Sequence, residues 1–208
     1  MFNAKFFKDN GYLVVPKILS GELLDFIGIH AYNKARIGGV RKKPDGTIDD
    51  EQVPNTPSFY GDFVMENLQD FLLPKIESAT GMKLFPTYTY FRVYKAGDIL
   101  EKHKDRHSCE ISMTVCLRKK RNEKIWAIYA DNTDYKKEHN LGEGHIARVM
   151  LEEGDAMVYK GCEVEHWREP YNDGTKLAQV FLHYVDANGP HAEWKNDKNP
   201  DKYFAQEK

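Results

Sequence analysis

The spacing of apolar residues changes character part-way along the chain. Before that point, residues 20–37 and 62–79 repeat apolar side chains at helical spacing, and the first of these stretches follows a short β-branched run at 11–16. Pro74 interrupts the second stretch, which predicts either a kink or two short helices, and Gly81 marks its end. The N-terminal part is therefore predicted to be a strand followed by a helical layer.

From Leu84 onward, short segments rich in Val, Ile, Thr, Tyr and Phe are separated by clusters of Gly, Asp, Asn and Lys. This pattern is typical of an all-β sandwich or barrel. We therefore predict a mainly β fold with flanking helices (α+β), in which the N-terminal helices pack on one sheet. The predicted strands are 87–94, 110–117, 124–129, 145–151, 156–159, 164–168 and 176–185.

The 208 residues suit one domain. We expect a helical lead-in at 1–83, a β core at 84–186 and a C-terminal tail at 187–208. Residues 38–60 carry Gly, Pro and Asp without periodicity, and they are expected to form a surface loop that lies over a site.

Composition and charge exclude several classes of partner. Hydrophobic residues make up 41% of the chain and charged residues 30%, and the net charge of −2 provides no general attraction to nucleic acid or membranes. No stretch approaches the roughly 20 apolar residues of a membrane span, and the N-terminus lacks the apolar run of a signal peptide. Three cysteines do not suggest a disulfide framework. We expect a cytoplasmic protein without nucleic-acid or membrane partners, and oligomerisation stays possible.

The first indication of chemistry is the tripeptide His103-Lys104-Asp105. In a strand, residues two apart point to the same face, so an imidazole and a carboxylate would lie side by side. A second imidazole from a distant strand would complete the two-histidine, one-carboxylate set that holds non-heme Fe(II). His166 lies within the predicted strand 164–168 and could supply it. A His-x-Asp step alone is a weak indication, since it occurs by chance in many chains.

Several motifs together resemble the Fe(II)/2-oxoglutarate-dependent oxygenases, in particular their prolyl-4-hydroxylase-like branch. These motifs are Tyr94-Lys95-Ala96-Gly97, the His103–Asp105 step, residues 154–159, His166 and Lys176. The resemblance covers most of the predicted β core, and it implies a double-stranded β-helix, which is a jelly roll related to the cupins.

The resemblance also implies roles for individual residues. His103, Asp105 and His166 would be the metal ligands. Lys176, ten positions after His166, would pair with the far carboxylate of 2-oxoglutarate. Tyr94 stands where the family has a tyrosine near the metal-bound end of that cosubstrate. Thr114 and Cys116 occupy the region of a further cosubstrate contact, where this chain departs from the animal prolyl hydroxylase pattern.

Other residues compete for these roles. Arg168 shares a strand face with His166, and its guanidinium grips a carboxylate better than an ammonium does, so it rivals Lys176 or binds an anionic group of the prime substrate. His183 lies on the opposite strand face from Lys176, and we expect it to be structural. A further set alternates along one predicted strand and forms either a polar pocket wall or a half-exposed aromatic face, namely Tyr88, Tyr90, Arg92 and Tyr94.

The resemblance implies a reaction that uses Fe(II), O2 and 2-oxoglutarate, with ascorbate as a supporting reductant. Oxidative decarboxylation of 2-oxoglutarate to succinate and CO2 would be coupled to hydroxylation of a C–H bond. The best substrate hypothesis is a prolyl residue in a peptide or protein, and a small molecule is the other partner class. Two alternatives stay open. One is a non-oxygenase cupin-like isomerase or hydrolase, and the other is a metal-binding module without turnover.

Overall fold

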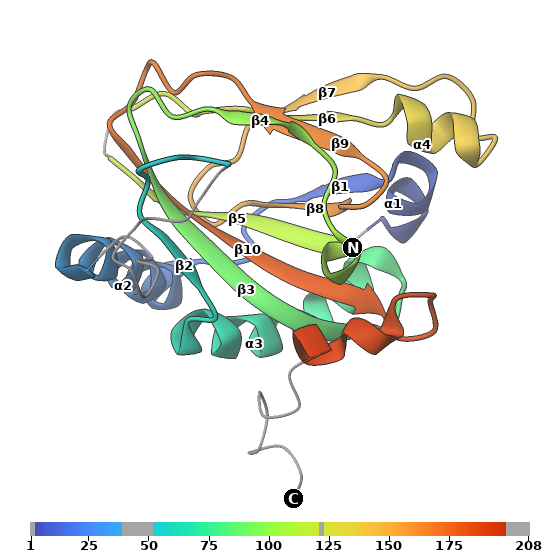
Figure 1. Cartoon of the computed structure of the whole chain (residues 1–208), viewed down its shortest axis with the longest axis horizontal. Helices are drawn as coiled ribbons and strands as arrows, with labels where there is room; N and C mark the ends of the chain where they lie inside the picture. Colours follow the sequence, from blue (N-terminus) through green and yellow to red (C-terminus); the bar gives the residue numbers. More distant parts are fainter. Residues whose placement is uncertain (1–2, 39–51, 121–122, 199–208) are drawn as a thin grey trace, which may run out of the picture.

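The computed structural model describes residues 3–38, 52–120 and 123–198. Their strands form two sheets that face each other (Figure 1). The larger sheet contains, in spatial order, β1 (Tyr12–Val15), β8 (Ala156–Lys160), β5 (Ile111–Lys119), β10 (Lys176–Asp186), β3 (Leu84–Lys95) and β2 (Ser58–Tyr60). The smaller sheet contains β4 (Leu100–His103), β9 (Glu165–Arg168), β6 (Ile128–Asp131) and β7 (Ile146–Val149).

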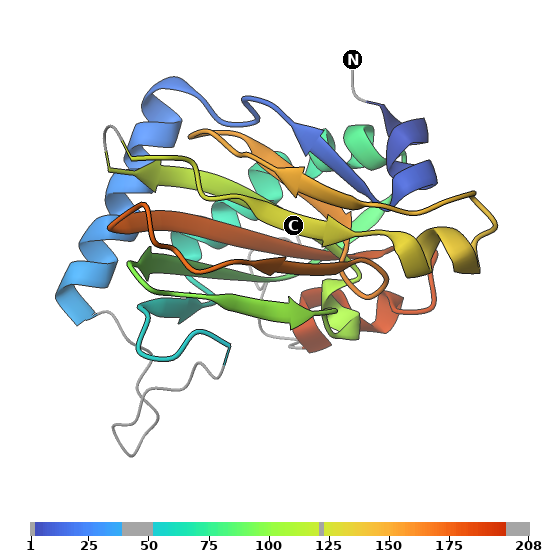
Figure 2. The same ribbon diagram turned by 90° about the horizontal axis from the view of Figure 1, so that it is seen from above.

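Neighbouring strands in both sheets run antiparallel, and most come from distant parts of the sequence. β10, near the end of the chain, lies between β5 and β3. The predicted mainly β class with helices on one sheet is thereby confirmed. The second sheet lies over the other face of the larger one, as the view from above shows (Figure 2).

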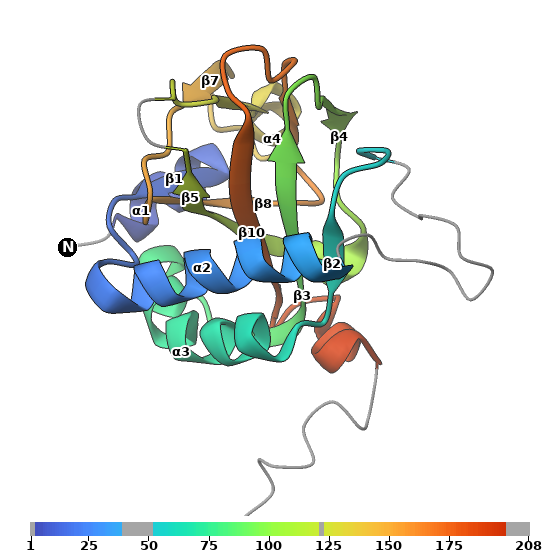
Figure 3. The same cartoon turned by 90° about the vertical axis from the view of Figure 1, so that its left-hand side faces the viewer.

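Helices α2 (Gly21–Gly38) and α3 (Phe63–Thr80) cover the outer face of the larger sheet (Figure 3). The Asp62 side chain accepts hydrogen bonds from the first amides of α3. Gly81, with a φ of 73°, ends the helix in a left-handed conformation, as a glycine readily does. α3 runs through Pro74 as one element, so the two-helix alternative is wrong.

The larger sheet has a hydrophobic core on each face because side chains alternate along its strands. On β10, Ala178, Val180 and Leu182 pack in the core beneath the helices. Leu177 and Phe181 pack in the second core, between the two sheets. The residues of the candidate metal centre lie in this second, inter-sheet layer.

Short elements and strand ends differ from the sequence predictions. β2 and β4 were not predicted, and the strand expected at 124–129 begins at Ile128. Part of the predicted 38–60 loop, residues 39–51, lies outside the described residues. Elements this short give too few positions for a periodicity, and their pairing partners are remote in sequence. The further unpredicted elements are α1 (Ala4–Asn10), α4 (Thr133–Glu138), η1 (His107–Cys109) and η2 (Ala192–Lys198).

α1 and α4 are held together at one end of the molecule (Figure 1). The Tyr135 hydroxyl donates a 2.5 Å hydrogen bond to the Lys8 carbonyl, and Asn132 Nδ2 donates one of 3.0 Å to the Asn10 carbonyl. Among all the helices described, none combines the length and the apolar character that a bilayer crossing requires.

Candidate metal centre

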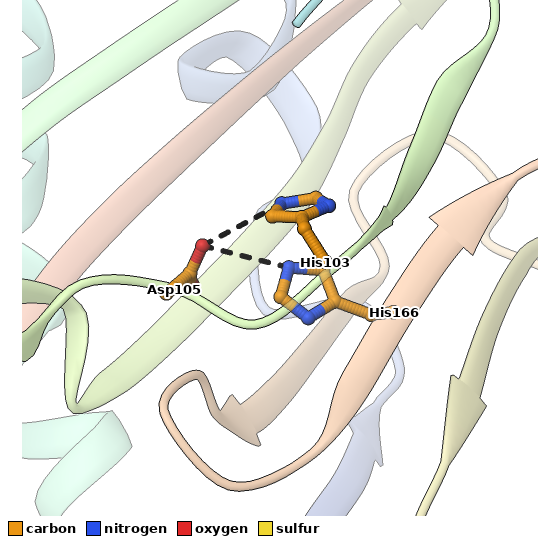
Figure 4. Close-up of side chains that lie close together, drawn as sticks. All are labelled: His103, Asp105 and His166. Carbon is orange, nitrogen blue, oxygen red and sulfur yellow. Dashed lines mark ion pairs between the residues drawn. The ribbon is translucent and has the colours of Figure 1, made fainter.

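Three residues that are up to 63 positions apart in sequence lie close together in the structure, namely His103, Asp105 and His166. His103 is the last residue of β4, and it lies directly opposite His166 of β9 in the strand register. Asp105 follows in the next loop, where its amide donates a 2.8 Å hydrogen bond to the Gly161 carbonyl. All three side chains point toward one another (Figure 4). The structure therefore assembles the triad expected from the sequence.

Both imidazoles present the same nitrogen to the same carboxylate oxygen. The Nε2 atoms of His103 and His166 each lie 3.6 Å from Asp105 Oδ1. The Nδ1 atom of His103 lies 2.7 Å from the Glu101 carbonyl, and that of His166 lies 3.0 Å from the Val164 carbonyl. A carbonyl only accepts, so each Nδ1 atom donates a proton to its carbonyl, and the Nε2 atom of a neutral ring is then the one with a lone pair for a metal.

This donor set suits a divalent metal ion. The three ligand atoms lie within 4.8 Å of one another. His166 is fully buried, and burial lowers its pKa, which favours the neutral form that a metal ligand needs. Two neutral imidazoles and one carboxylate form the set typical of non-heme Fe(II). The residues therefore fit the metal that the resemblance implies.

A second layer of contacts fixes the Asp105 carboxylate. The Ser112 hydroxyl on β5 donates a 3.1 Å hydrogen bond to Asp105 Oδ2. On the other side lies Gly161, where a Cβ atom would come within 2.5 Å of Oδ2 and 2.2 Å of the Cys109 carbonyl oxygen. Only glycine leaves the carboxylate in place. Sequence reasoning missed both residues, although the glycine directly after β8 was a visible indication.

The triad opens into a cavity of about 560 Å³ between the sheets. Tyr88, Tyr90 and Arg92 line it, as expected for one face of β3. His183, which lies on the opposite face of β10 from Lys176 as expected, also lines the cavity. Burial lowers the pKa of His183 to about 4, which keeps its imidazole neutral near pH 7.

Arg168 is a cation enclosed between the sheets. Its side chain is almost completely buried, and Nη1 donates a 2.7 Å hydrogen bond to the Trp126 carbonyl. The guanidinium also lies 4.7 Å from the centre of the Trp126 ring. Within residues 3–38, 52–120 and 123–198, Nε has no hydrogen-bond partner and no carboxylate pairs with the guanidinium. Burial lowers the pKa of Arg168, and the buried Tyr94 lies nearby. An anion is the expected partner for such a group.

Lys176 lies elsewhere. It is exposed, and it lines a surface depression with Tyr32 and Lys119 on the helix-covered side of the larger sheet. The reason is the alternation along β10, because even-numbered residues from Ala178 onward face the helices and odd-numbered ones face the other sheet. The structure therefore does not bring Lys176 to the metal centre, which corrects that expectation.

Thr114 and Cys116 point into the inter-sheet layer without lining the cavity. Thr114 Oγ1 accepts a 2.6 Å hydrogen bond from Gln179 Nε2. In the described part of the chain, the buried Oε1 atom of Gln179 has no partner. Cys116 packs among apolar side chains, and burial raises its pKa to about 12, so it is a neutral thiol. Both residues lie on the face of the larger sheet that borders the inter-sheet layer.

No protein-family model and no curated protein matches the sequence. Solved structures do match in fold. The epimerase SnoN from nogalamycin biosynthesis, described as non-heme and α-ketoglutarate dependent, has a TM-score of 0.69 at 13% identity, with 88% of this chain and 81% of SnoN covered. A prolyl-4-hydroxylase from Pseudomonas putida has a TM-score of 0.63 at 13% identity, with 86% and 96% covered.

HygX from Streptomyces hygroscopicus was solved with nickel, 2-oxoglutarate and hygromycin B bound. It has a TM-score of 0.62 at 13% identity, with 88% of this chain and 86% of HygX covered. Identities this low establish the fold alone. The chain therefore has the double-stranded β-helix fold of these 2-oxoglutarate-dependent enzymes.

Proposed function

We propose that the protein is an Fe(II)- and 2-oxoglutarate-dependent oxygenase that hydroxylates a C–H bond. The observation that carries this proposal is the convergence of His103 Nε2, His166 Nε2 and Asp105 Oδ1 at the floor of a cavity between two sheets. When bound there, iron would supply oxygen activation coupled to decarboxylation of 2-oxoglutarate. The chain's own residues hold the metal, bind the cosubstrate and exclude water.

Arg168 is the residue that we propose for the far carboxylate of 2-oxoglutarate. It stands two positions after His166 on the same face of β9, about 7 Å further along the strand. This spacing suits a dicarboxylate whose other end chelates the metal. An anion at Arg168 would neutralise the buried guanidinium and give its unpartnered Nε an acceptor. Tyr94 lies close enough to contribute to the same subsite.

Arg92 is the alternative residue for this subsite. It lines the cavity, and its Nη1 atom lies 3.5 Å from the Tyr94 hydroxyl. Because Tyr94 lies near both arginines, the two guanidiniums flank one region of the inter-sheet layer. Apolar and aromatic side chains close the layer around it and would keep bulk water away from a bound cosubstrate, namely Leu100, Ile128, Tyr159 and Phe181.

For the prime substrate, we propose a prolyl residue in a peptide or protein. Its support is the family resemblance together with the likeness in fold to the prolyl-4-hydroxylase from Pseudomonas putida. HygX, with hygromycin B bound, has the same fold, so small molecules belong in the same substrate screen. We further propose that the protein works in the cytoplasm, in keeping with its three free cysteines.

The test is succinate formation from 2-oxoglutarate with Fe(II), O2 and ascorbate. Wild-type protein should form succinate, and His166→Ala should not, because one metal ligand is gone. Lys176→Ala is the matched control, since this exposed residue lies outside the inter-sheet layer, and it should match the wild type. Equal succinate formation by His166→Ala and wild type would refute the triad assignment.

The rival classes give different results in anaerobic binding. A cupin-like isomerase or hydrolase, or a metal-binding module, would bind Fe(II) through the same triad but would not bind 2-oxoglutarate. Titration of the anaerobic Fe(II) form with 2-oxoglutarate should instead give the charge-transfer absorption of a chelated metal. The absence of binding at millimolar 2-oxoglutarate would favour these rivals.

A further inference from the structure

A chain of hydrogen bonds connects the metal centre to a buried histidine on the opposite sheet. His183 on β10 lies directly opposite Ser112 on β5 in the strand register. Its Nδ1 atom is 2.8 Å from Ser112 Oγ, which in turn is 3.1 Å from Asp105 Oδ2. These two hydrogen bonds thus connect β10, β5 and the loop after β4.

The direction of each hydrogen bond follows from counting protons. Ser112 Oγ contacts the Asp105 carboxylate, the Cys109 carbonyl oxygen at 3.2 Å, and His183 Nδ1, and Tyr159 is a further side-chain hydrogen-bond partner. The two oxygens only accept, and the hydroxyl has a single proton to donate. That proton is needed by one of the oxygens, so the His183 Nδ1 atom must donate to Ser112.

We propose that His183, acting through Ser112, is a positioning residue for the metal ligand Asp105. With Nδ1–H donating to Ser112 and Ser112 donating to Asp105 Oδ2, one carboxylate oxygen is held by the protein. The other oxygen, Oδ1, is left facing His103 and His166. The inference rests on the proposed function, because it concerns how the proposed metal ligand is oriented.

Several contacts hold the imidazole in this position. The His183 ring packs against Tyr88 with the ring centres 4.5 Å apart, and its side chain is almost fully buried. The His183 carbonyl accepts a 2.6 Å hydrogen bond from Gln69 on α3. A rigid donor of this kind favours one carboxylate rotamer over the others, and partners of metal ligands typically change metal affinity about 10- to 100-fold.

The experiment measures Co²⁺ and anaerobic Fe²⁺ affinity in four variants of the full chain. His183→Phe removes the donor but keeps a ring against Tyr88, and Ser112→Ala removes the central hydroxyl. Both should weaken metal binding about 10- to 100-fold. His183→Gln restores an N–H donor and should recover part of the loss. Ser108→Ala is the matched control and should bind like wild type, because Ser108 is another fully buried serine and, among the described residues, its hydroxyl has a hydrogen-bond contact only with Cys109 Sγ.

A double variant separates positioning from a general structural effect. If His183 acts through Ser112, then His183→Phe combined with Ser112→Ala should bind metal no more weakly than Ser112→Ala alone. Additive losses in the double variant would overturn the proposal, and so would affinities within twofold of wild type in both single variants. If wild-type protein binds metal and these variants bind it equally well, only this inference fails. The proposed function fails instead if wild type binds none.

A second measurement needs no variant and no metal. Histidine ¹⁵N chemical shifts of the metal-free protein report which ring nitrogen is protonated. The His183 resonances should show a neutral ring with the proton on Nδ1. A proton on Nε2 would overturn the proposal even if a variant failed to fold.

Discussion

His103 and His166 lie directly opposite each other on β4 and β9, with their ring centres 4.3 Å apart. This pairing places one ligand from the middle of the chain against one from its C-terminal third. The strand register alone sets their separation, so the metal centre depends on the smaller sheet being formed.

Replacing either histidine should abolish metal binding. His103→Ala leaves one imidazole and one carboxylate, which is too few protein ligands for the non-heme iron site. Equilibrium dialysis or calorimetry with Co²⁺ would measure this. His139→Ala is the control, since His139 hydrogen-bonds to the Tyr135 carbonyl at 2.8 Å, away from the triad. It should bind metal like wild type, and comparable losses in both variants would contradict the site.

Gly161→Ala should lower the metal affinity as well as the stability of the fold. The added methyl group would overlap the Cys109 carbonyl and the Asp105 carboxylate, so the carboxylate must move. We expect a stability loss of about 1–3 kcal/mol, which is typical of overpacking, together with a metal affinity at least about 10-fold lower. Thermal unfolding and metal titration measure the two effects.

Gly144→Ala provides the matched control for that prediction. Its Cβ atom would lie 2.3 Å from the Thr133 Cα atom, so it creates a similar backbone clash at α4. It should destabilise the protein without changing metal affinity. Equal metal affinities in the two glycine variants would show that Gly161 does not support Asp105.

Arg168→Met should weaken 2-oxoglutarate binding at least about 30-fold, because a buried charged hydrogen bond to a carboxylate contributes about 2 kcal/mol or more. Lys176→Ala should leave this affinity unchanged, since its side chain is exposed on the other side of the larger sheet. Anaerobic titration of the metal-loaded protein measures both. A large loss in Arg92→Met with none in Arg168→Met would assign the subsite to Arg92 instead.

Protein stability should fall in acid through His183. Burial lowers its pKa from the ordinary 6.5 to about 4. Between these values the unfolded chain binds a proton that the folded chain does not, so the free energy of unfolding decreases as pH falls. The stability is fully present above pH 6.5, and roughly 3 kcal/mol is lost as pH falls to the folded-state pKa, at about 1.4 kcal/mol per pH unit.

Denaturant unfolding of metal-free protein between pH 7.5 and 4.5 measures this loss. His183→Phe has no proton to gain at this position, so its stability should depend less steeply on pH than that of wild type. Parallel curves for the two proteins would contradict the buried neutral state of His183.

The sequence by itself determined the fold class and pointed to the candidate metal triad. Segments rich in β-branched and aromatic residues from Leu84 onward, and helical spacing before it, specify strands and helices locally. The spacing of His103 and Asp105 predicted that their side chains meet on one strand face. In the structure Asp105 lies in the loop after β4, where its amide donates to the Gly161 carbonyl and its carboxylate accepts from the Ser112 hydroxyl. Short elements such as β4 escaped prediction because hydrogen bonds to a remote strand create them, and nothing local indicates that partner.

Only the tertiary structure decided which face of each strand meets the cavity. Lys176 and His183 lie on opposite faces of β10, as their spacing requires, but the sequence does not show which face the helices cover. Both faces of this central strand are buried, so hydrophobicity does not distinguish them. Helices α2 and α3 pack on one face of the larger sheet, and the smaller sheet therefore covers its other face. That choice placed His183 inside the inter-sheet layer and left Lys176 exposed.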